Sequence, residues 1–192
     1  VAPKDAYSEK IVELGAGFKN VDIDKSGKNI LKDFKTIWQY LSIYRKLKPK
    51  VVLNFTPKTN IYSTVAAKLV GAKAINNIAG LGVMFISNNL SSKLVKLLYR
   101  LTQWMSHHIF FQNEEDKKLF IDSKLIRGNH SISRLPGSGV DLKSFELQPL
   151  KNQSGVTFIL VARLLVEKGV EIYAEAAKRL KQENKDVRFF LL

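Results

Sequence analysis

The sequence has no cysteine, few acidic residues and no long apolar run, and each shortage excludes a class of protein. Without cysteine the chain forms neither a disulfide nor a thiolate metal site, which fits a reducing compartment. No apolar stretch approaches the ~18–20 residues of a membrane span. No charged start precedes an apolar signal core. We therefore expect a cytoplasmic protein that does not cross a bilayer.

Acidic residues are scarce relative to basic ones, 17 against 31, so the formal net charge is +14. Such a charge favours anionic partners: nucleic acid, acidic lipid head groups or phosphorylated substrates. The cations are spread along the chain. Residues 28–50 hold seven cations and one acid, and residues 88–108 hold three cations and no acid. A solvated helix face accounts for such runs as readily as an anion-binding surface does.

Several catalytic signatures are also missing. The sequence has no P-loop, no serine nucleophile elbow and no paired catalytic carboxylates. Gly15-Ala16-Gly17 lacks the third glycine of a dinucleotide fingerprint and follows a predicted helix rather than a strand. The adjacent His107 and His108 point to opposite faces of a strand and cannot easily chelate one metal ion, so no metal site is predicted.

What the chain does contain is a regular alternation of strand and helix patterns. Helices are expected over 28–48, about 59–70, 91–105, 114–123 and from 169 onward, and strands over 51–55, 72–78, 108–112, 132–135, 156–162 and 187–192. This order predicts an α/β fold with a parallel sheet covered by helices on both faces. Periodicity is lost near 148–155, where we place a linker between domains 1–149 and 150–192.

The turn before the last helix places two cations at the carboxyl end of a strand. The run over 156–162 is apolar and is expected to be a buried strand, and Gly169 is expected to open the helix. Arg163 and Lys168 lie between them, where open α/β sheets bind ligands and where a helix start favours an anion. Two solvated surface cations are the alternative. The residues with helical spacing after the turn are Ile172, Ala176, Ala177 and Leu180.

Five segments, in order, resemble GT-B glycosyltransferases of the group 1, family 4 kind. Arg163 with Lys168-Gly169 is similar to that family's donor-diphosphate signature. Residues 1–15 resemble the second strand and following helix of its amino-terminal domain. Residues 51–82 resemble the strand, Asn-Ile-Tyr helix, strand and Gly-Leu-Gly turn of transferases that build capsular, lipopolysaccharide or lipid-linked oligosaccharides. Residues 110–120 resemble the strand and helix before the family's interdomain crossing. Residues 135–145 resemble its Gly-Val-Asp…Phe turn.

The resemblance implies a Rossmann-like amino-terminal GT-B domain and the start of a second Rossmann-like domain, truncated at both ends. The family's first strand and glycine-bearing loop would precede Val1, and the glutamates that hold the donor would follow Leu192. We therefore expect the 192-residue chain alone to be inactive. Where many relatives keep a histidine, this chain has Asn76, Asn77 and Ala79, so the resemblance supplies no general base.

The resemblance further implies a retaining enzyme that uses no cofactor or metal. It would transfer a hexose or N-acetylhexosamine from a nucleotide sugar, UDP-linked, to a polyprenyl-diphosphate-linked glycan in bacterial surface polysaccharide synthesis, peripherally at the inner face of the cytoplasmic membrane. Arg163 and Lys168 would be the catalytic residues. Gly80, Leu81, Gly82, Gly137, Gly139 and Asp141 would line the donor and acceptor cleft, although ordinary turn chemistry explains these positions as well.

Two further questions stay open from the sequence. The helix over 91–105 has Leu94, Leu97, Leu98, Leu101 and Trp104 along one side and cations beside them; this side either packs on the sheet or binds an anionic membrane surface. The charge of +14 also admits a non-catalytic nucleic-acid-binding protein, but RNA-recognition aromatics, a helix-turn-helix and a zinc site are lacking, so we expect no nucleic-acid partner. An inactive glycosyltransferase remnant is the third alternative.

Overall fold

The computed structural model describes residues 1–24, 30–81, 85, 90–149, 155–183 and 186–192. The described chain forms two compact units, Val1–Gly139 (unit 1) and Val140–Leu192 (unit 2). The sequence places a domain boundary at 149/150, whereas the contacts within the chain divide it between Gly139 and Val140. The assignment of 1–149 and 150–192 to two domains stays a prediction.

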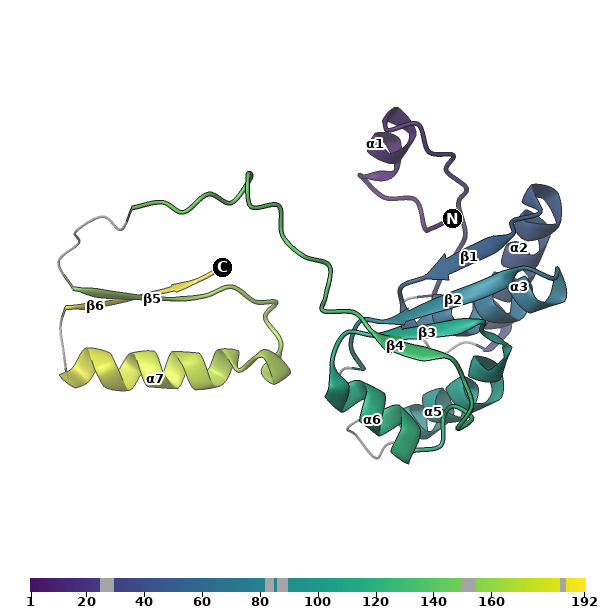
Figure 1. Ribbon diagram of the computed structural model, residues 1–192. Coiled ribbons are helices and arrows are strands. Elements are labelled where there is room, and N and C mark those ends of the chain that lie inside the picture. Colours follow the sequence, from purple (N-terminus) through teal and green to yellow (C-terminus); the bar gives the residue numbers. More distant parts are fainter. Residues whose placement is uncertain (25–29, 82–84, 86–89, 150–154, 184–185) are drawn as a thin grey trace. The chain divides into compact units, whose positions relative to one another are not determined.

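Unit 1 contains a four-stranded parallel sheet in the order β1-β2-β3-β4, in which the strands lie side by side (Figure 1). Each strand is joined to the next through a segment that contains helix, the arrangement expected for parallel strands. The strands are β1 (Val51–Asn54), β2 (Lys73–Ile78), β3 (His108–Phe111) and β4 (Ile132–Arg134). The helical segments are α1 (Ser8–Glu13), α2 (Ile30–Leu47), η1 (Thr59–Ser63), α3 (Thr64–Leu69), α5 (Leu90–Thr102), η2 (Gln103–Met105) and α6 (Glu114–Asp122).

Local sequence signals explain where several of these elements begin and end. Asn113 caps α6: its Oδ1 accepts the backbone N–H of Asp116 at 2.6 Å, and its Nδ2 donates to the Asp116 carboxylate at 2.9 Å. Lys48 has a φ of 46° directly after α2, and Pro49 prevents the helix from continuing. Gly71, with a φ of 78°, reverses the chain between α3 and β2 in a conformation that strains other residues.

The core of unit 1 lies between the sheet and the helices on one of its faces. The side chains of Ala74, Asn76 and Ile78 on β2, and of Ile109 and Phe111 on β3, are buried. The intervening side chains are exposed or half-buried, as are those of β1 that alternate with Val52 and Asn54. Helical cover on both faces is therefore not seen over the described residues. Four rings fill part of this core, with centroids 5.1–5.6 Å apart between neighbours: Phe85, Tyr99, Phe111 and Phe120.

Unit 2 is a smaller parallel pair, β5 (Val156–Leu160) and β6 (Val187–Leu191), with the connection η3 (Val166–Lys168) and α7 (Val170–Glu183). Its strands and helix were expected, but the burial of β5 is corrected: Val156 and Ile159 are more than half exposed. The face of α7 toward the sheet carries Tyr173, whose hydroxyl is shared between the carbonyls of Phe158 at 3.0 Å and Phe190 at 2.9 Å. Ile172 is 76% exposed, because its position lies off that face.

None of the helices in the described ranges combines the length and the apolar character needed to cross a membrane.

Candidate functional site

The turn that follows β5 contains both residues predicted to be catalytic. The β5–β6 ladder continues to Ala162, whose N–H donates to the Leu192 carbonyl at 3.0 Å, and the chain then leaves the sheet at Arg163. A single turn of η3 ends at Lys168. Gly169 follows with a φ of 73°, a left-handed conformation that glycine adopts without strain. The expectation that Gly169 opens the helix is thus corrected, since α7 begins at Val170 after this reversal.

The side chains of Arg163 and Lys168 are exposed to solvent. Within the described residues neither side chain forms an ion pair. The first N–H groups of α7 lack carbonyl partners inside the helix, as at every helix start. Glu167 and Glu171 share the segment, so it has no net positive charge and any hold on an anion depends on where the two cationic side chains point. The structure brings both residues into one turn; their catalytic role stays a prediction.

Three of the other predicted positions lie at the carboxyl edge of the sheet in unit 1. Gly80 and Leu81 follow β2, and Gly137 follows β4, so all three sit where parallel strands end. Leu81 is buried. A side-chain carbon placed on Gly80 would meet nothing within 4 Å, and Gly80 does not have a left-handed φ. Neither sterics nor backbone conformation within the described residues therefore requires a glycine at position 80. Gly82 lies outside the described residues.

Gly139 and Asp141 lie on either side of the division between the units. Gly137 and Gly139 have φ values of 90° and 76°, so the backbone itself favours glycine at both positions. Asp141 accepts the Ser144 hydroxyl at 2.8 Å and the Lys143 N–H at 3.0 Å. These hydrogen bonds, that of Ser144 most strongly, lower the pKa of Asp141. The carboxylate of Asp141 thus stabilises its own turn.

A buried set of polar side chains beneath the carboxyl edge was missed by the sequence analysis. We call it the amide network. Asn76 lies at its centre: its Oδ1 accepts from Asn54 at 2.8 Å and Thr64 at 3.0 Å, and its Nδ2 donates to the Gln103 Oε1 at 2.7 Å and the Asn60 carbonyl at 3.2 Å. Gln103 also donates to the Asn60 carbonyl at 2.9 Å. The signal for this network was an asparagine between two apolar residues on the inward side of the strand, because a buried polar group needs partners.

The amide network joins five elements of unit 1 and therefore positions the edge above it. It connects β1 to β2 through Asn54, and β2 to η1, α3 and η2 through Asn60, Thr64 and Gln103. Of these elements, β1 and β2 end at the carboxyl edge of the sheet, and η1 follows the loop after β1. We infer that the network fixes where the carboxyl ends of β1 and β2 lie relative to each other, and therefore where Gly80 and Leu81 lie.

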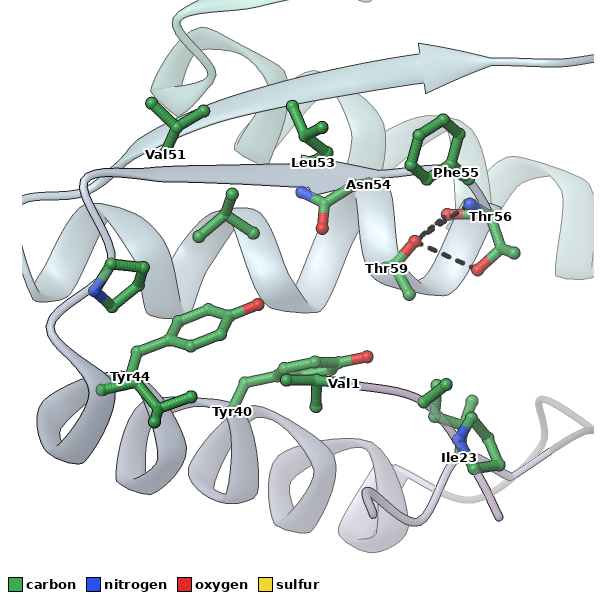
Figure 2. Close-up of a pocket in the computed structure, with 15 residues that line it drawn as sticks. Val1, Ile23, Tyr40, Tyr44, Val51, Leu53, Asn54, Phe55, Thr56 and Thr59 are labelled. Atoms are coloured by element: carbon green, nitrogen blue, oxygen red, sulfur yellow. Dashed lines mark hydrogen bonds between the residues drawn. The ribbon is translucent and has the colours of Figure 1, made fainter. Parts of the chain in front are cut away.

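A groove of about 560 Å³ runs along the outer edge of β1, between this strand and α2 (Figure 2). Tyr40, Tyr44, Leu53 and Phe55 are among its mostly apolar lining residues, and none of its lining residues in the described ranges is a lysine or an arginine. Burial raises the pKa of Tyr40, whose hydroxyl has no hydrogen-bond partner in the part of the chain that is described. An apolar groove without cations is unsuited to a diphosphate, so we do not assign the donor to it.

Two of the three histidines lie within hydrogen-bond distance of a serine hydroxyl. His130 Nε2 lies 3.0 Å from the Ser106 hydroxyl, and burial lowers the pKa of His130. His108 Nδ1 lies 2.8 Å from the Ser131 hydroxyl, and burial likewise lowers its pKa, with a smaller effect of His107. Among the residues with described positions, no three His, Asp or Glu side chains gather as metal ligands would. The expectation that no metal is needed stays a prediction.

Comparison with known proteins identifies the family. Residues 4–120, most of unit 1, match the family model described as glycosyl transferase 4-like. The chain belongs to this family. The resemblance inferred from the sequence is thereby confirmed for the segments within unit 1. The match ends before Arg163 and Lys168, so it does not test the predicted diphosphate site.

A curated relative extends the similarity of this glycosyl transferase 4-like chain beyond unit 1. The UDP-Gal:alpha-D-GlcNAc-diphosphoundecaprenol alpha-1,3-galactosyltransferase of Escherichia coli is 28% identical over 172 residues, which cover 81% of this chain and 43% of the relative. Among solved structures, the S. aureus MnaA–UDP complex has a TM-score of 0.56 at 16% identity, covering 94% of this chain and 50% of that chain. The UDP-GlcNAc 2-epimerase of Methanocaldococcus jannaschii has a TM-score of 0.51 at 15% identity, covering 95% and 62%.

These solved structures show the fold alone, because their sequences are so distant. They confirm the predicted fold class of this family member, an α/β chain of Rossmann-like, GT-B type. The chain spans less than half of the curated relative and about half to three fifths of the two structures. The residues predicted to bind donor and acceptor are not tested by any of these similarities.

Proposed function

We propose that the protein to which this chain belongs transfers a hexose or N-acetylhexosamine from a UDP-linked sugar to a polyprenyl-diphosphate-linked glycan, in bacterial surface polysaccharide synthesis. The observation that carries this proposal is the sequence similarity to a transferase whose name specifies a UDP-sugar and a diphosphoundecaprenol acceptor. Membership of the glycosyl transferase 4-like family supports the reaction class. The exact sugar is left to experiment.

On the donor side, Arg163 and Lys168 are the proposed catalytic residues. As the bond between the sugar and the diphosphate breaks, negative charge grows on the phosphate oxygens. A guanidinium binds two of these oxygens with its planar fork, and an ammonium adds a mobile point charge. Both contacts strengthen as the charge develops, so they stabilise the transition state more than the bound donor. The reaction is proposed to retain the configuration of the sugar, as in GT-B enzymes of this kind.

On the acceptor side, the exposed backbone at Gly80 supports the proposal. Gly80 has no left-handed φ, and a side chain at this position would meet no neighbouring atom. The absence of a side chain instead leaves the backbone open to a ligand. Leu81 and Gly137 belong to the same carboxyl edge of the sheet, and we propose that Gly139, Asp141 and Gly82 complete this side. No metal or other cofactor is proposed, because the cations of the chain would balance the charge of the leaving diphosphate.

A transfer assay tests the proposal. The protein that contains this chain is incubated with radiolabelled UDP-sugars and a GlcNAc-diphosphopolyprenyl acceptor, and labelled lipid is extracted. We expect label in the lipid, and a loss of roughly 10²–10³ in turnover for Arg163→Ala and for Lys168→Ala. Arg188→Ala, which removes an exposed arginine on β6, is the matched control and should leave turnover unchanged. Full turnover in both the Arg163→Ala and the Lys168→Ala variant would refute the catalytic roles proposed for these two residues.

A further inference from the structure

Helix α5 carries an exposed stripe of leucines on the side opposite the sheet. Leu90, Leu94, Leu97 and Leu101 are 84%, 46%, 50% and 54% exposed. At 3.6 residues per turn these four positions fall within an arc of about 60°. The stripe is therefore continuous along one side of α5.

The opposite side of α5 accounts for the packing of this helix, so the leucine stripe is not needed for the core. Ser92, Tyr99 and Thr102 are buried, and Val95 and Leu98 pack against the core cluster. Of the five residues expected to lie together on the apolar side, only Leu98 is half-buried against the core. Packing on the sheet, one of the two alternatives left open by the sequence, therefore does not hold for Leu94, Leu97, Leu101 and Trp104.

Basic side chains flank the stripe along one side of α5 and at the carboxyl end of this helix. Lys93, Lys96 and Arg100 are on α5 itself, which has no acidic residue. At its carboxyl end a hollow of about 380 Å³ is lined by Arg100, Lys124 and Arg127 together with Leu101, Trp104, Leu125 and Ile126, and no acid of the described residues lines it. The Trp104 ring is 43% exposed, with the Arg127 guanidinium 5.3 Å and the Lys68 ammonium 6.0 Å from its centroid.

We propose that this surface, the leucine stripe with Trp104 and the basic hollow, docks on an anionic phospholipid bilayer. Leucines would enter the boundary between head groups and acyl chains, Trp104 would lie at the head-group level, and the cations of the hollow would bind lipid phosphates. A helix with an apolar stripe, flanking cations and a tryptophan at one end is the arrangement that lies in a membrane interface.

Charge argues against one other occupant of this surface, and its apolar character argues against a second. A second copy of the chain that met the same surface in a symmetric dimer would bring two clusters of cations together, which is repulsive. Nucleic acid would satisfy the cations, but four exposed leucines contribute nothing to contacts with a phosphate backbone. An anionic bilayer offers both an apolar interior and negative head groups, so it matches the whole surface.

This inference deepens the proposed function, in which the acceptor is attached to a membrane lipid. The test is vesicle binding, which needs neither donor nor acceptor, so its failure is distinguishable from failure of the transfer assay. Co-flotation of the purified chain is measured with phosphatidylcholine vesicles with and without about 30 mol% phosphatidylglycerol, in about 0.05 M and about 0.5 M NaCl. We expect binding that requires phosphatidylglycerol and falls at high salt.

Two pairs of variants separate the parts of the surface. Leu94→Gln with Leu97→Gln should lower the partition coefficient roughly tenfold or more, because two side chains lose their place in the interface. Leu142→Gln with Leu147→Gln, which changes two exposed leucines outside α5, is the matched control and should not lower it.

The second pair tests the cations, and its control pair removes the same amount of positive charge from another part of the chain. Arg100→Gln with Arg127→Gln should lower binding to phosphatidylglycerol vesicles roughly tenfold or more. Lys178→Gln with Lys181→Gln on α7 removes two exposed cations elsewhere and should have a much smaller effect. Circular dichroism checks the fold of each variant, and Leu90→Gln with Leu101→Gln replaces the first pair if that pair unfolds.

Three results would overturn the proposal. The first is vesicle binding that the α5 leucine variants leave unchanged. The second is an equal loss of binding in the arginine pair of Arg100 and Arg127 and in its lysine control pair on α7, which would indicate an effect of net charge alone. The third is concentration-dependent dimerisation in ultracentrifugation that the leucine variants abolish, with no binding to vesicles, which would assign the stripe to self-association.

Discussion

The amide network makes a sharp prediction about two neighbouring asparagines of β2. Asn76 is fully buried and bonded through both atoms of its amide, whereas Asn77 is half-buried and its Oδ1 has no partner in the part of the chain that is described. The same substitution to alanine should therefore cost much more stability at position 76 than at position 77. Since residue type and strand are identical, each variant is the control for the other.

The expected magnitude follows from the groups that lose their partner. In Asn76→Ala the Gln103 Oε1 loses the donor at 2.7 Å, and the Asn54 Nδ2 keeps only a long 3.4 Å contact with Thr64. Each buried polar group left without a partner costs about 1–3 kcal/mol, so we expect about 3 kcal/mol or more of lost stability. Asn77→Ala removes an oxygen that already lacks a partner, and should stay within about 1 kcal/mol of the parent protein.

Thermal and urea unfolding of the 192-residue chain, followed by circular dichroism, measure this difference. For a unit of this size the loss at Asn76 corresponds to a fall of roughly 10 °C in melting temperature. Asn77→Ala should shift it by only a few degrees. Equal losses in the two variants, or a loss below about 1 kcal/mol at Asn76, would show that the network does not hold the strand ends in place.

Three further predictions concern the turns and one histidine. Gly80→Ala should leave the melting temperature unchanged yet lower glycosyl transfer, whereas Gly71→Ala, at a φ of 78°, should cost about 1–2 kcal/mol of stability in urea unfolding. Arg163→Ala should weaken the binding of UDP in calorimetry, and equal affinity would argue against a diphosphate contact. Burial lowers the pKa of His130 in the folded state below the unfolded value near 6.5. The contribution of neutral His130 to stability is therefore complete above that unfolded value and is lost as the pH falls below it. His130→Gln should flatten the fall of the melting temperature between about pH 7 and pH 5.

Short-range signals were enough to predict the elements of this chain. A helix was expected from residue 114 onward, and the side chain of Asn113, which three acids follow, caps α6 at that position. The alternation of strands and helices predicts a parallel sheet, and each ladder of the structure is parallel. These features depend on residues within a few positions of each other, which is why a single sequence reveals them.

Burial was predicted less well than secondary structure. The apolar residues of β5 were expected to be inside, and Val156 and Ile159 are largely exposed. The leucines of α5 follow the helical period, yet the side that packs on the core is the one with Tyr99 and Thr102. Periodicity identifies the apolar sides of an element, but it does not say which of them meets a neighbour.

The sequence by itself determined the α/β alternation, the caps and turns, the family resemblance and the presence of two cations after β5, because all of these are properties of short segments. Only the tertiary structure decided that Asn54, Asn76 and Gln103 meet in one buried network, and that the leucines of α5 face away from the core. The physical reason is the same in both cases. Hydrogen-bond partners and packing faces are set by which distant elements lie together, and that information exists only once the chain has folded.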